Sequence, residues 1–294
     1  MANWKKWLVA ARYCATLPMR QQRNRRLAAE GQSPLMVLFY HRVADTFPND
    51  WTISNQLFQR QIEWIRRRFD VISLQELQDR IRAKQNQRPA VAITFDDGYA
   101  ENCDQALPYL LENQIPFTYF VTLDNMLTGQ SFPHDAQANC PAKPNTLEQI
   151  QLLAQAGVEI GGHTNTHPDV GAIQDEATLQ DEVFDAITQL EDYINKKVSY
   201  FAFPYGLPQN LHASVYRMAQ QAGLKGVCSA YGDYNSVNQD PFHIRRIHAD
   251  AEMVRLKNWL TFDSRKPFVP TIFDELERTS VNEHLLAESD FHVV

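Results

Sequence analysis

Two uninterrupted apolar runs, Leu35–Tyr40 (LMVLFY) and Ala90–Phe95 (AVAITF), constrain the fold more than any other feature of this sequence. Strands that are covered on both faces have this composition, because neither face meets water. Around them, segments with apolar residues at helical spacing alternate with further short apolar runs. This alternation predicts an α/β fold in which parallel strands are joined by right-handed helical crossovers.

No glycine-rich phosphate loop follows the first strand, so the pattern favours a distorted (β/α) barrel of about seven parallel strands over an open sheet. The expected strands are 35–40, 71–72, 90–95, 117–122, 158–160, 200–203, 226–229 and 243–247. The expected helices are 54–68, 74–81, 105–113, 146–156, 176–195, 211–222 and 252–260.

The chain divides into three parts by composition. Residues 1–33 are expected to form a basic helical arm, residues 34–262 the barrel, and residues 263–294 an irregular C-terminal tail. Within the barrel, residues 124–145 contain Gly129, Pro133, Pro141 and Pro144 without periodicity. They predict a long loop over one mouth of the barrel, and ordered loops of this length are often functional.

The charge is unevenly distributed. The whole chain carries a formal net charge of −7, yet residues 1–29 contain seven basic residues and no acidic one. The acidic body argues against nucleic acid as a partner, since phosphate binding needs a basic surface. A basic helix with Trp4 and Trp7 on one side can lie in a membrane interface. The same helix can instead pack on the protein body with its arginines solvated, and both interpretations remain open.

Other features bear on localisation. No segment approaches 18 consecutive apolar residues, the N-terminal apolar run is too broken for a secretory signal, and the four cysteines form no framework. Widely spaced cysteines are typical of free thiols in a reducing compartment. We therefore expect a cytoplasmic protein, with peripheral membrane contact through residues 1–30 as one option.

A pair of aspartates marks the first candidate site. Asp96 and Asp97 follow the apolar strand 90–95 directly, and Gly98 permits a tight turn there. Two adjacent carboxylates beside a buried strand repel each other and lose hydration. A metal resolves that conflict if one carboxylate binds it and the other acts as a base. The alternative is that the pair caps the next helix.

A pair of histidines marks the second candidate site. His163 and His167 follow the short strand 158–160, and residues four apart in a helical turn or compact loop can bind one metal. Alone, such a pair is more often a surface feature. Here it follows another strand, at the end of the barrel where active sites form. One carboxylate and two imidazoles leave coordination positions open, as in catalytic metal centres.

These motifs resemble those of the polysaccharide deacetylase family, carbohydrate esterase family 4, whose members share the nodulation-type deacetylase homology domain. Thr94–Gly98 (TFDDG) matches the first family motif and His163–His167 (HTNTH) the second. Phe201–Gly206 (FAFPYG) matches the third, and the similarity spans roughly residues 34–250. The family fold, a distorted (β/α) barrel with about seven strands, agrees with the pattern described above.

The resemblance implies roles for particular residues. Asp97, His163 and His167 would hold a divalent metal, usually zinc, with cobalt, nickel or iron as options. Asp96 would be the general base, and the backbone N–H of Tyr205 would stabilise the oxyanion. The segment 244–250 resembles the final family motif, which makes His248 the candidate proton donor. The expected substrate-binding residues are Pro204 and Tyr205 of the third motif, together with His41. His41 is included because it follows the first strand; the alternative is that it is a hydrogen-bonded structural histidine.

The sequence departs from the family pattern in two places. Many members carry an arginine two residues before the proline of the third motif, where this chain has Ala202. We expect Arg246, rather than Arg245, to supply the missing cation. The fourth family motif has no clear match, although residues 231–234 lie in that region.

The leading prediction is a metal-dependent hydrolase that removes N-acetyl groups, or less favourably O-acetyl groups, from an N-acetylhexosamine-containing glycan. The expected partner is a glycan or a lipid- or nucleotide-linked sugar precursor. An alternative keeps the metal site but cleaves a non-sugar amide or a cyclic imide. A non-catalytic carbohydrate-binding protein is a third option, disfavoured because such a protein needs no open three-ligand site.

Overall fold

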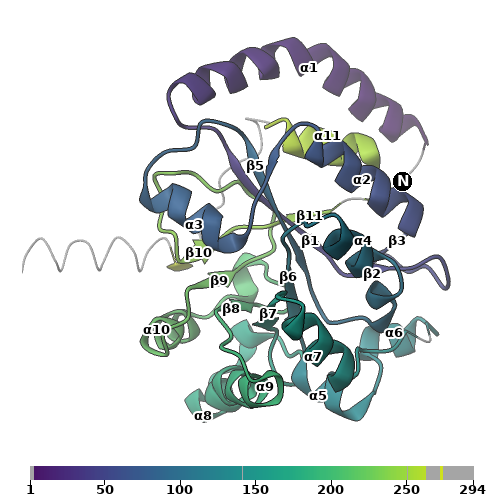
Figure 1. Ribbon diagram of the computed structural model, residues 1–294, viewed down its shortest axis with the longest axis vertical. Helices are drawn as coiled ribbons and strands as arrows, with labels where there is room; N and C mark the ends of the chain where they lie inside the picture. The colour runs from purple at the N-terminus through teal and green to yellow at the C-terminus, as the bar shows by residue number, and fades with distance from the viewer. Residues whose placement is uncertain (1–2, 141, 250, 263–271, 274–294) are drawn as a thin grey trace, which may run out of the picture.

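The computed structural model describes residues 3–140, 142–249, 251–262 and 272–273 (Figure 1). Its centre is a curled parallel sheet, and the order of the strands along it is β10-β9-β8-β7-β6-β5-β1-β11, with β4 pairing β5. The strands are β1 (Leu35–Tyr40), β4 (Asp70–Val71), β5 (Ala90–Phe95), β6 (Thr118–Val121), β7 (Glu159–Gly162), β8 (Tyr200–Ala202), β9 (Gly226–Cys228), β10 (His243–Ile244) and β11 (Ile247–His248). The predicted parallel (β/α) barrel is confirmed.

The last predicted strand, 243–247, is broken in two. β10 pairs with β9 at one edge of the sheet, whereas β11 pairs with β1 at the other edge, so Arg245 and Arg246 connect the two edges of the curled sheet. At the break, the side chain of Asn235 takes up both backbone groups of Arg245: its Oδ1 accepts from the Arg245 N–H and its Nδ2 donates to the Arg245 carbonyl. If β10 and β11 are taken as one strand, the path contains the seven strands expected.

The helices lie outside the curled sheet (Figure 1). Serine and threonine side chains cap the N-termini of several of them, including Ser54, Ser73 and Thr146. The predicted helix 176–195 contains a π-helical segment, Gln180–Asp185, between α8 and α9. The helices are α1 (Asn3–Ala29), α2 (Asn55–Arg66), α3 (Leu74–Arg82), α4 (Ala106–Glu112), α5 (Leu123–Thr128), α6 (Pro133–Gln137), α7 (Leu147–Gln155), α8 (Glu176–Leu179), α9 (Ala186–Ile194), α10 (Ala213–Gln221) and α11 (Met253–Leu260).

Two segments beside the barrel mouth differ from a plain loop. The predicted long loop 124–145 contains most of α5 and all of α6, which the absence of periodicity did not reveal because each is too short to show one. Residues 42–53 form a separate two-stranded sheet from β2 (Arg42–Val43) and β3 (Thr52–Ile53). Both segments contribute to the walls of the site described below.

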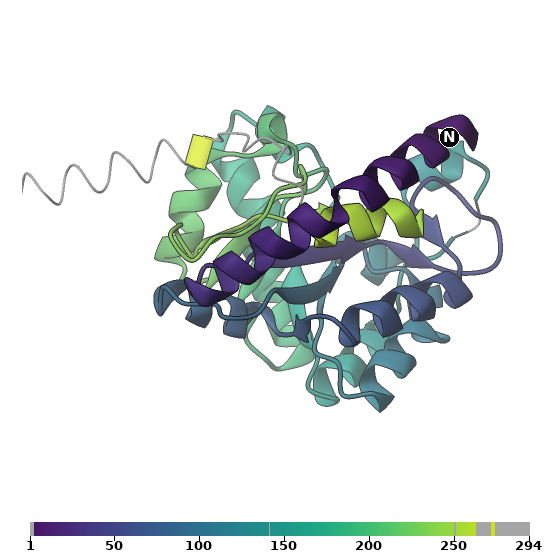
Figure 2. The same cartoon turned by 90° about the horizontal axis from the view of Figure 1, so that it is seen from above.

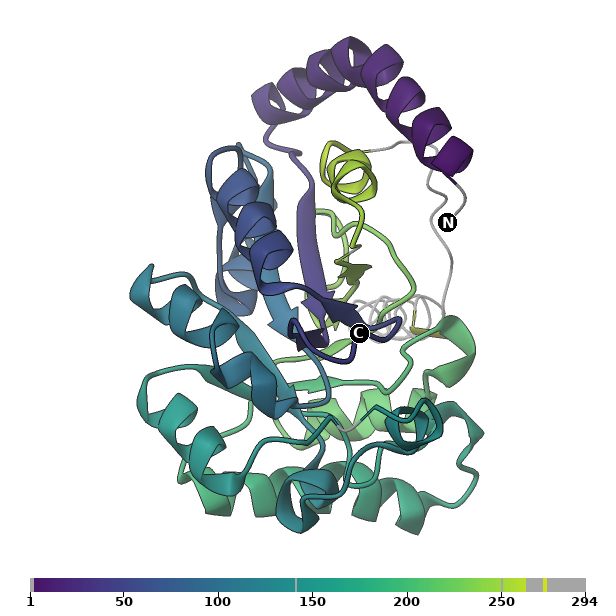
Figure 3. The ribbon, with the colours of Figure 1, turned by 90° about the vertical axis from the view of Figure 1, so that its right-hand side faces the viewer.

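The predicted basic arm is the 27-residue helix α1, which lies along α11 (Figure 2) and at the opposite end of the molecule from α9 (Figures 1 and 3). Buried Arg20 joins α1 to α11 through bonds to the backbone oxygen and Oδ1 of Asn258. Among the described residues, none of the helices combines the length and the apolar character needed to cross a bilayer. The predicted tail 263–294 lies outside the described residues, apart from Ile272 and Phe273.

Candidate active site

The predicted site residues gather at one end of the barrel, because the carboxyl ends of its parallel strands meet there. Asp96 and Asp97 follow β5, His163 follows β7, and Tyr205 lies just beyond β8. The 3₁₀ helix that comes after the aspartates, Ala100–Cys103, has Tyr99 as its N-cap. The two carboxylates therefore do not cap the following helix, and they are only 3% exposed each.

Strained backbone is concentrated at this end of the barrel. Asp97, Thr164, His167 and Tyr205 all have φ between +61° and +70°, a region that residues other than glycine seldom occupy. Such conformations persist where the surrounding structure enforces them, and they cluster at functional sites. The Gly98 turn, with φ of +88° and its N–H bonded to the Asp96 carbonyl, was expected from the sequence.

Asp97, His163 and His167 form a compact cluster. Asp97 Oδ1 lies 3.3 Å from Nε2 of His163 and 3.3 Å from Nε2 of His167, and the three candidate ligand atoms lie within 4.8 Å of one another. Separations near 3.3 Å are those of neighbouring ligands around a tetrahedral ion with bonds of about 2 Å. The two imidazole rings meet edge to face, with centroids 5.0 Å apart.

A backbone carbonyl orients His163. Its Nδ1 lies 2.8 Å from the Ala202 carbonyl, and because a carbonyl only accepts, Nδ1 carries the proton and Nε2 presents a lone pair. That lone pair faces Asp97 Oδ1, which is buried and has no hydrogen-bond partner among the described residues. Two acceptors thus point at each other, and a cation between them relieves their repulsion. The residues fit a divalent metal.

The two imidazoles also control the ionisation of Asp97. Burial alone would raise the pKa of its carboxyl, but the adjacent side chains of His163 and His167 hold that pKa well below the usual range. The carboxylate is therefore ionised at neutral pH. An ionised carboxylate and two imidazoles form the donor set typical of catalytic zinc sites.

Arg246 holds the other aspartate. Its Nη1 lies 2.6 Å from Asp96 Oδ1 and its Nη2 2.9 Å from Oδ2, a bidentate pair that is almost fully buried. Burial would raise the pKa of Asp96, yet the guanidinium lowers it. Arg245 points elsewhere, donating to the Tyr231 hydroxyl and to Gln239 Oε1.

The π-helical segment Gln180–Asp185 holds the loop that carries His167. Glu182 accepts from the backbone N–H of Thr166 at 2.9 Å and from its hydroxyl at 2.7 Å. The Glu182 carbonyl accepts from the Asn165 N–H at 2.8 Å. Single π-helical turns inside helices are frequent at functional sites. Here the extra residue places Glu182 against the loop between the two histidines.

A cavity of about 420 Å³ opens above these groups. Its floor is formed by the two aspartates and two histidines, and its walls are largely aromatic and apolar. The full lining is Phe39, His41, Trp51, Asp96, Asp97, His134, His163, His167, Phe203, Tyr205, Leu207, Ala230 and His248. A concave, mostly apolar cavity with a few convergent polar groups is the usual form of a small-molecule or cofactor site.

Most of the predicted site residues lie in or directly behind this cavity. His41, Tyr205 and His248 line it, and Arg246 lies behind Asp96. Pro204 is buried and is not part of the lining; its carbonyl accepts from Gly206 N–H in the turn that places Tyr205.

Sequence reasoning missed several wall residues. Trp51 and Leu207 lie in segments without a motif, and nothing in their spacing indicates a site. His134 lies in the segment 124–145, which was predicted to cover the barrel mouth but whose individual residues were not assigned roles. A search for histidines within that segment would have found it.

The fold and site together define a (β/α)-barrel protein with a buried Asp–His–His cluster beside an arginine-held aspartate. The sequence profile of the family described as polysaccharide deacetylase matches residues 83–227, which contain both aspartates and both histidines of the cluster. Over these residues the chain is similar to the polysaccharide deacetylase family. The Bacillus subtilis protein YxkH, whose name places it among polysaccharide deacetylases, is 23% identical over 231 residues, covering 77% of this chain and 75% of that protein.

Solved structures show the same fold at low sequence identity. The Streptococcus pyogenes deacetylase PplD, solved in complex with acetate, superposes with a TM-score of 0.66 at 18% identity, over 78% of this chain and 99% of that one. A de-N-acetylase from Aggregatibacter actinomycetemcomitans gives 0.62 at 21% identity, over 77% and 100%. IcaB from Ammonifex degensii gives 0.61 at 22% identity, over 78% and 97%.

Proposed function

We propose that this protein is a metal-dependent deacetylase that removes N-acetyl groups from an N-acetylhexosamine-containing glycan or glycan precursor and releases acetate. O-acetyl groups are the less favoured substrate. One observation carries the proposal: an Asp–His–His cluster lies beside a buried, arginine-paired aspartate on the floor of a cavity. The similarity of residues 83–227 to the polysaccharide deacetylase family supports the same chemistry.

Asp97, His163 and His167 would hold the metal, and we propose zinc because two imidazoles and one carboxylate suit it. Cobalt, nickel and iron accept the same ligands. When bound, such an ion polarises the acetyl carbonyl and lowers the pKa of water. The Ala202 carbonyl keeps Nε2 of His163 free to act as a ligand.

The residues around the cluster have separate roles in the proposed hydrolysis. Asp96 accepts the proton of the attacking water, and Arg246 keeps Asp96 ionised so that it can do so. The backbone N–H of Tyr205 stabilises the negative charge that develops on the acetyl oxygen. An imidazole then protonates the departing amine, so that acetate and a free amino sugar leave.

Two imidazoles are available for that last proton transfer. His248 is the donor expected from the sequence, and His41 lies beside it with ring centroids 6.0 Å apart. Burial lowers the pKa of His41, while the charges of Asp97 and Asp96 oppose that shift. Because the net effect lowers the pKa of His41 and favours its neutral form, His248 is the stronger candidate.

The walls of the cavity support a sugar substrate. Trp51, Phe203 and Tyr205 provide flat apolar surfaces that can pack on the faces of pyranose rings. A cavity of about 420 Å³ accommodates a short stretch of glycan rather than a whole polymer. A lipid-linked or nucleotide-linked precursor therefore remains part of the proposal.

The test is acetate release from N-acetylglucosamine oligomers by protein reconstituted with zinc, with the Asp96→Asn variant as control. Release that disappears in this variant and with a chelator supports the proposal. Stoichiometric metal binding without release from any acetylated sugar would favour an amide or cyclic imide outside sugars. Failure to bind metal would overturn the mechanism.

We further propose that α1 contacts a membrane surface, where a lipid-linked substrate would reside. Trp4, Trp7 and Leu8 are 61%, 77% and 59% exposed, and residues 1–29 carry basic residues and no acidic ones. Basic helices with exposed tryptophans bind anionic membrane surfaces. Co-sedimentation with vesicles containing anionic lipid should exceed that with neutral vesicles and should fall in the Trp4→Ser/Trp7→Ser double variant. Equal sedimentation would contradict this contact, and cell fractionation tests the expected cytoplasmic location.

A further inference from the structure

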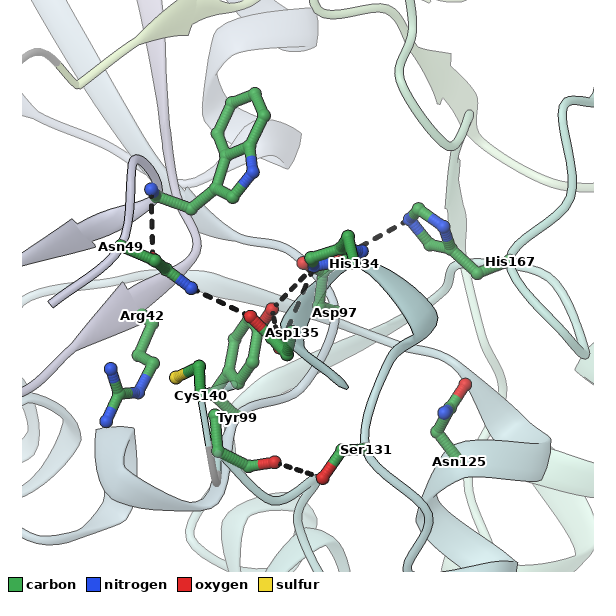
Figure 4. Close-up of polar contacts among 12 residues, drawn as sticks. Arg42, Asn49, Asp97, Tyr99, Asn125, Ser131, His134, Asp135, Cys140 and His167 are labelled. Carbon is green, nitrogen blue, oxygen red and sulfur yellow. Dashed lines mark hydrogen bonds and ion pairs between the residues drawn. The ribbon is translucent and has the colours of Figure 1, made fainter. Parts of the chain in front are cut away.

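The segment that contains α6 is fastened over the cavity by interactions of its own. We call residues 130–140 the α6 segment. Asn125 Nδ2 donates to the Gln130 carbonyl at 2.9 Å. Ser131 Oγ donates to the Ala142 carbonyl at 2.5 Å (Figure 4). Phe132, Cys140 and Ala142 form a small buried apolar cluster with Tyr99. The α6 segment is thus a fixed part of the cavity wall.

A buried acid anchors this segment. Asp135 is fully buried and accepts hydrogen bonds from the Tyr99 hydroxyl at 2.7 Å and from Asn49 Nδ2 at 2.7 Å (Figure 4). Asn49 Oδ1 in turn accepts from the Trp51 N–H at 3.0 Å. Asp135 therefore ties the α6 segment to the segment that carries Trp51 on another wall of the cavity.

The same network fixes the tautomer of His134. The Tyr99 hydroxyl has one proton, which it donates to Asp135, so its oxygen can only accept from His134. His134 Nε2 lies 3.0 Å from that oxygen and consequently carries a proton. In the neutral ring, Nδ1 is then a hydrogen-bond acceptor. Nε2 of His134 is therefore hydrogen-bonded within the protein, whereas Nδ1 is available to accept a hydrogen bond from a ligand.

His134 lies at the edge of the metal cluster without belonging to it. Its ring stacks on Phe132, with centroids 5.5 Å apart and planes inclined by 19°, and its centroid lies 6.2 Å from that of His167. Within the described part of the chain, the group of possible metal ligands contains His167 and does not contain His134. The side chain is 35% exposed and lines the cavity.

We propose that His134 is a substrate-binding residue whose Nδ1 accepts a hydrogen bond from a hydroxyl group of the bound sugar. Tyr99 and Asp135 are its positioning residues, since they hold the ring in the accepting tautomer. This inference rests on the deacetylase function proposed above. The inference assigns part of the substrate specificity to the α6 segment. Sugars that place a hydroxyl group opposite His134 Nδ1 should bind better than sugars that do not.

The test compares His134→Phe with the wild type on N-acetylglucosamine oligomers. Phenylalanine keeps the ring and its contact with Phe132 but removes both nitrogens. We expect KM to rise by roughly tenfold, the usual effect of losing one hydrogen bond, while kcat changes by less than about threefold. His134→Asn, which places an amide oxygen near the position of Nδ1, should recover part of the loss. Tyr99→Phe should raise KM in the same direction, because His134 can then adopt either tautomer.

Three controls separate binding from other roles. The metal content and the thermal unfolding midpoint of His134→Phe should equal those of the wild type. His212→Phe is the matched substitution away from the cavity, since His212 caps α10, and it should leave KM unchanged. Loss of metal, a fall in kcat at constant KM, or an unchanged KM in His134→Phe would each overturn the proposal.

A separate experiment distinguishes failure of the inference about His134 from failure of the proposed deacetylase function. Binding of the oligomer to the Asp96→Asn variant, followed by calorimetry, needs no turnover. If the wild type releases no acetate but the oligomer binds Asp96→Asn more tightly than Asp96→Asn/His134→Phe, the inference stands and the proposed function fails. If turnover occurs and His134→Phe leaves both KM and this affinity unchanged, only the inference fails.

Discussion

Arg246 and Asp96 form two parallel hydrogen bonds of 2.6 and 2.9 Å between groups that are shielded from water. The guanidinium also lies over the rings of Phe39 and Phe120, 5.0 and 5.3 Å from their centroids. In a low-dielectric environment, removal of one partner leaves an uncompensated buried charge. Substitution of Arg246 should therefore strongly change the properties of Asp96, the proposed general base.

Replacing Arg246 with methionine should raise the pKa of Asp96, because burial raises that pKa and the variant lacks the main charge that opposes burial. Asp96 would be protonated over more of the neutral range and could not accept a proton. We expect kcat/KM at pH 7 to fall by about 10²-fold and the acidic limb of its pH profile to move to higher pH. Activity measured from pH 5 to 9 tests this prediction.

Arg245→Met is the matched control, since Arg245 is equally buried but bonds to Tyr231 and Gln239. The acidic limb of the kcat/KM pH profile of Arg245→Met should coincide with that of the wild type. An Arg246→Met profile with an unmoved acidic limb would show that Asp96 is not the base whose ionisation limits the reaction.

The two candidate proton donors give different kinetic signatures. Loss of the donor should lower kcat by about 10²-fold and remove the alkaline limb, whereas loss of a neighbouring wall residue should mainly raise KM. We expect the first result for His248→Ala, since His248 is the donor implied by the final motif. We expect the second for His41→Ala, because burial lowers the pKa of His41 and favours its neutral form. The reverse pattern would assign the donor role to His41.

The sequence predicted the elements whose signals are local. Strand β5 was predicted to the residue, and the two motifs were placed at the same end of the barrel because parallel strands present their carboxyl ends together. The contact between Arg246 and Asp96 joins residues 150 positions apart. No local pattern indicates this contact; it was predicted from the family resemblance, because Ala202 stands where many family members have an arginine.

Features that depend on distant contacts could not be predicted. At the break between β10 and β11, the Arg245 backbone bonds to the side chain of Asn235, ten residues earlier in the sequence, and no local pattern indicates this contact. The predicted strand 158–160 stops short of Gly161 and Gly162, which belong to β7. A Cβ at Gly161 would lie 2.3 Å from the Phe120 ring and one at Gly162 2.7 Å from Ile187, so packing requires these glycines rather than a turn.

Removing the Glu182 side chain should weaken metal binding without removing a ligand. Glu182→Ala loses both side-chain bonds to Thr166, so the loop that carries His167 becomes less ordered before the metal binds. Loss of groups that orient metal ligands typically costs 10- to 100-fold in affinity, and we expect about tenfold here. Competition with a chromogenic chelator measures the change. Asp181→Ala, the same charge change at the adjacent exposed position, should bind metal as the wild type does.

The four cysteines should differ sharply in reactivity, because all are free thiols in different environments. Cys14 is exposed on α1, whereas burial raises the pKa of Cys228 to about 12 and keeps it protonated. The thiolate is the reacting form, so at pH 8 a disulfide reagent should modify Cys14 rapidly and Cys228 only after unfolding. Cys14→Ser should abolish the fast phase, as followed by absorbance and peptide mass analysis. Rapid labelling of Cys228 in the folded protein would show that the sheet around β9 opens readily, contrary to its full burial.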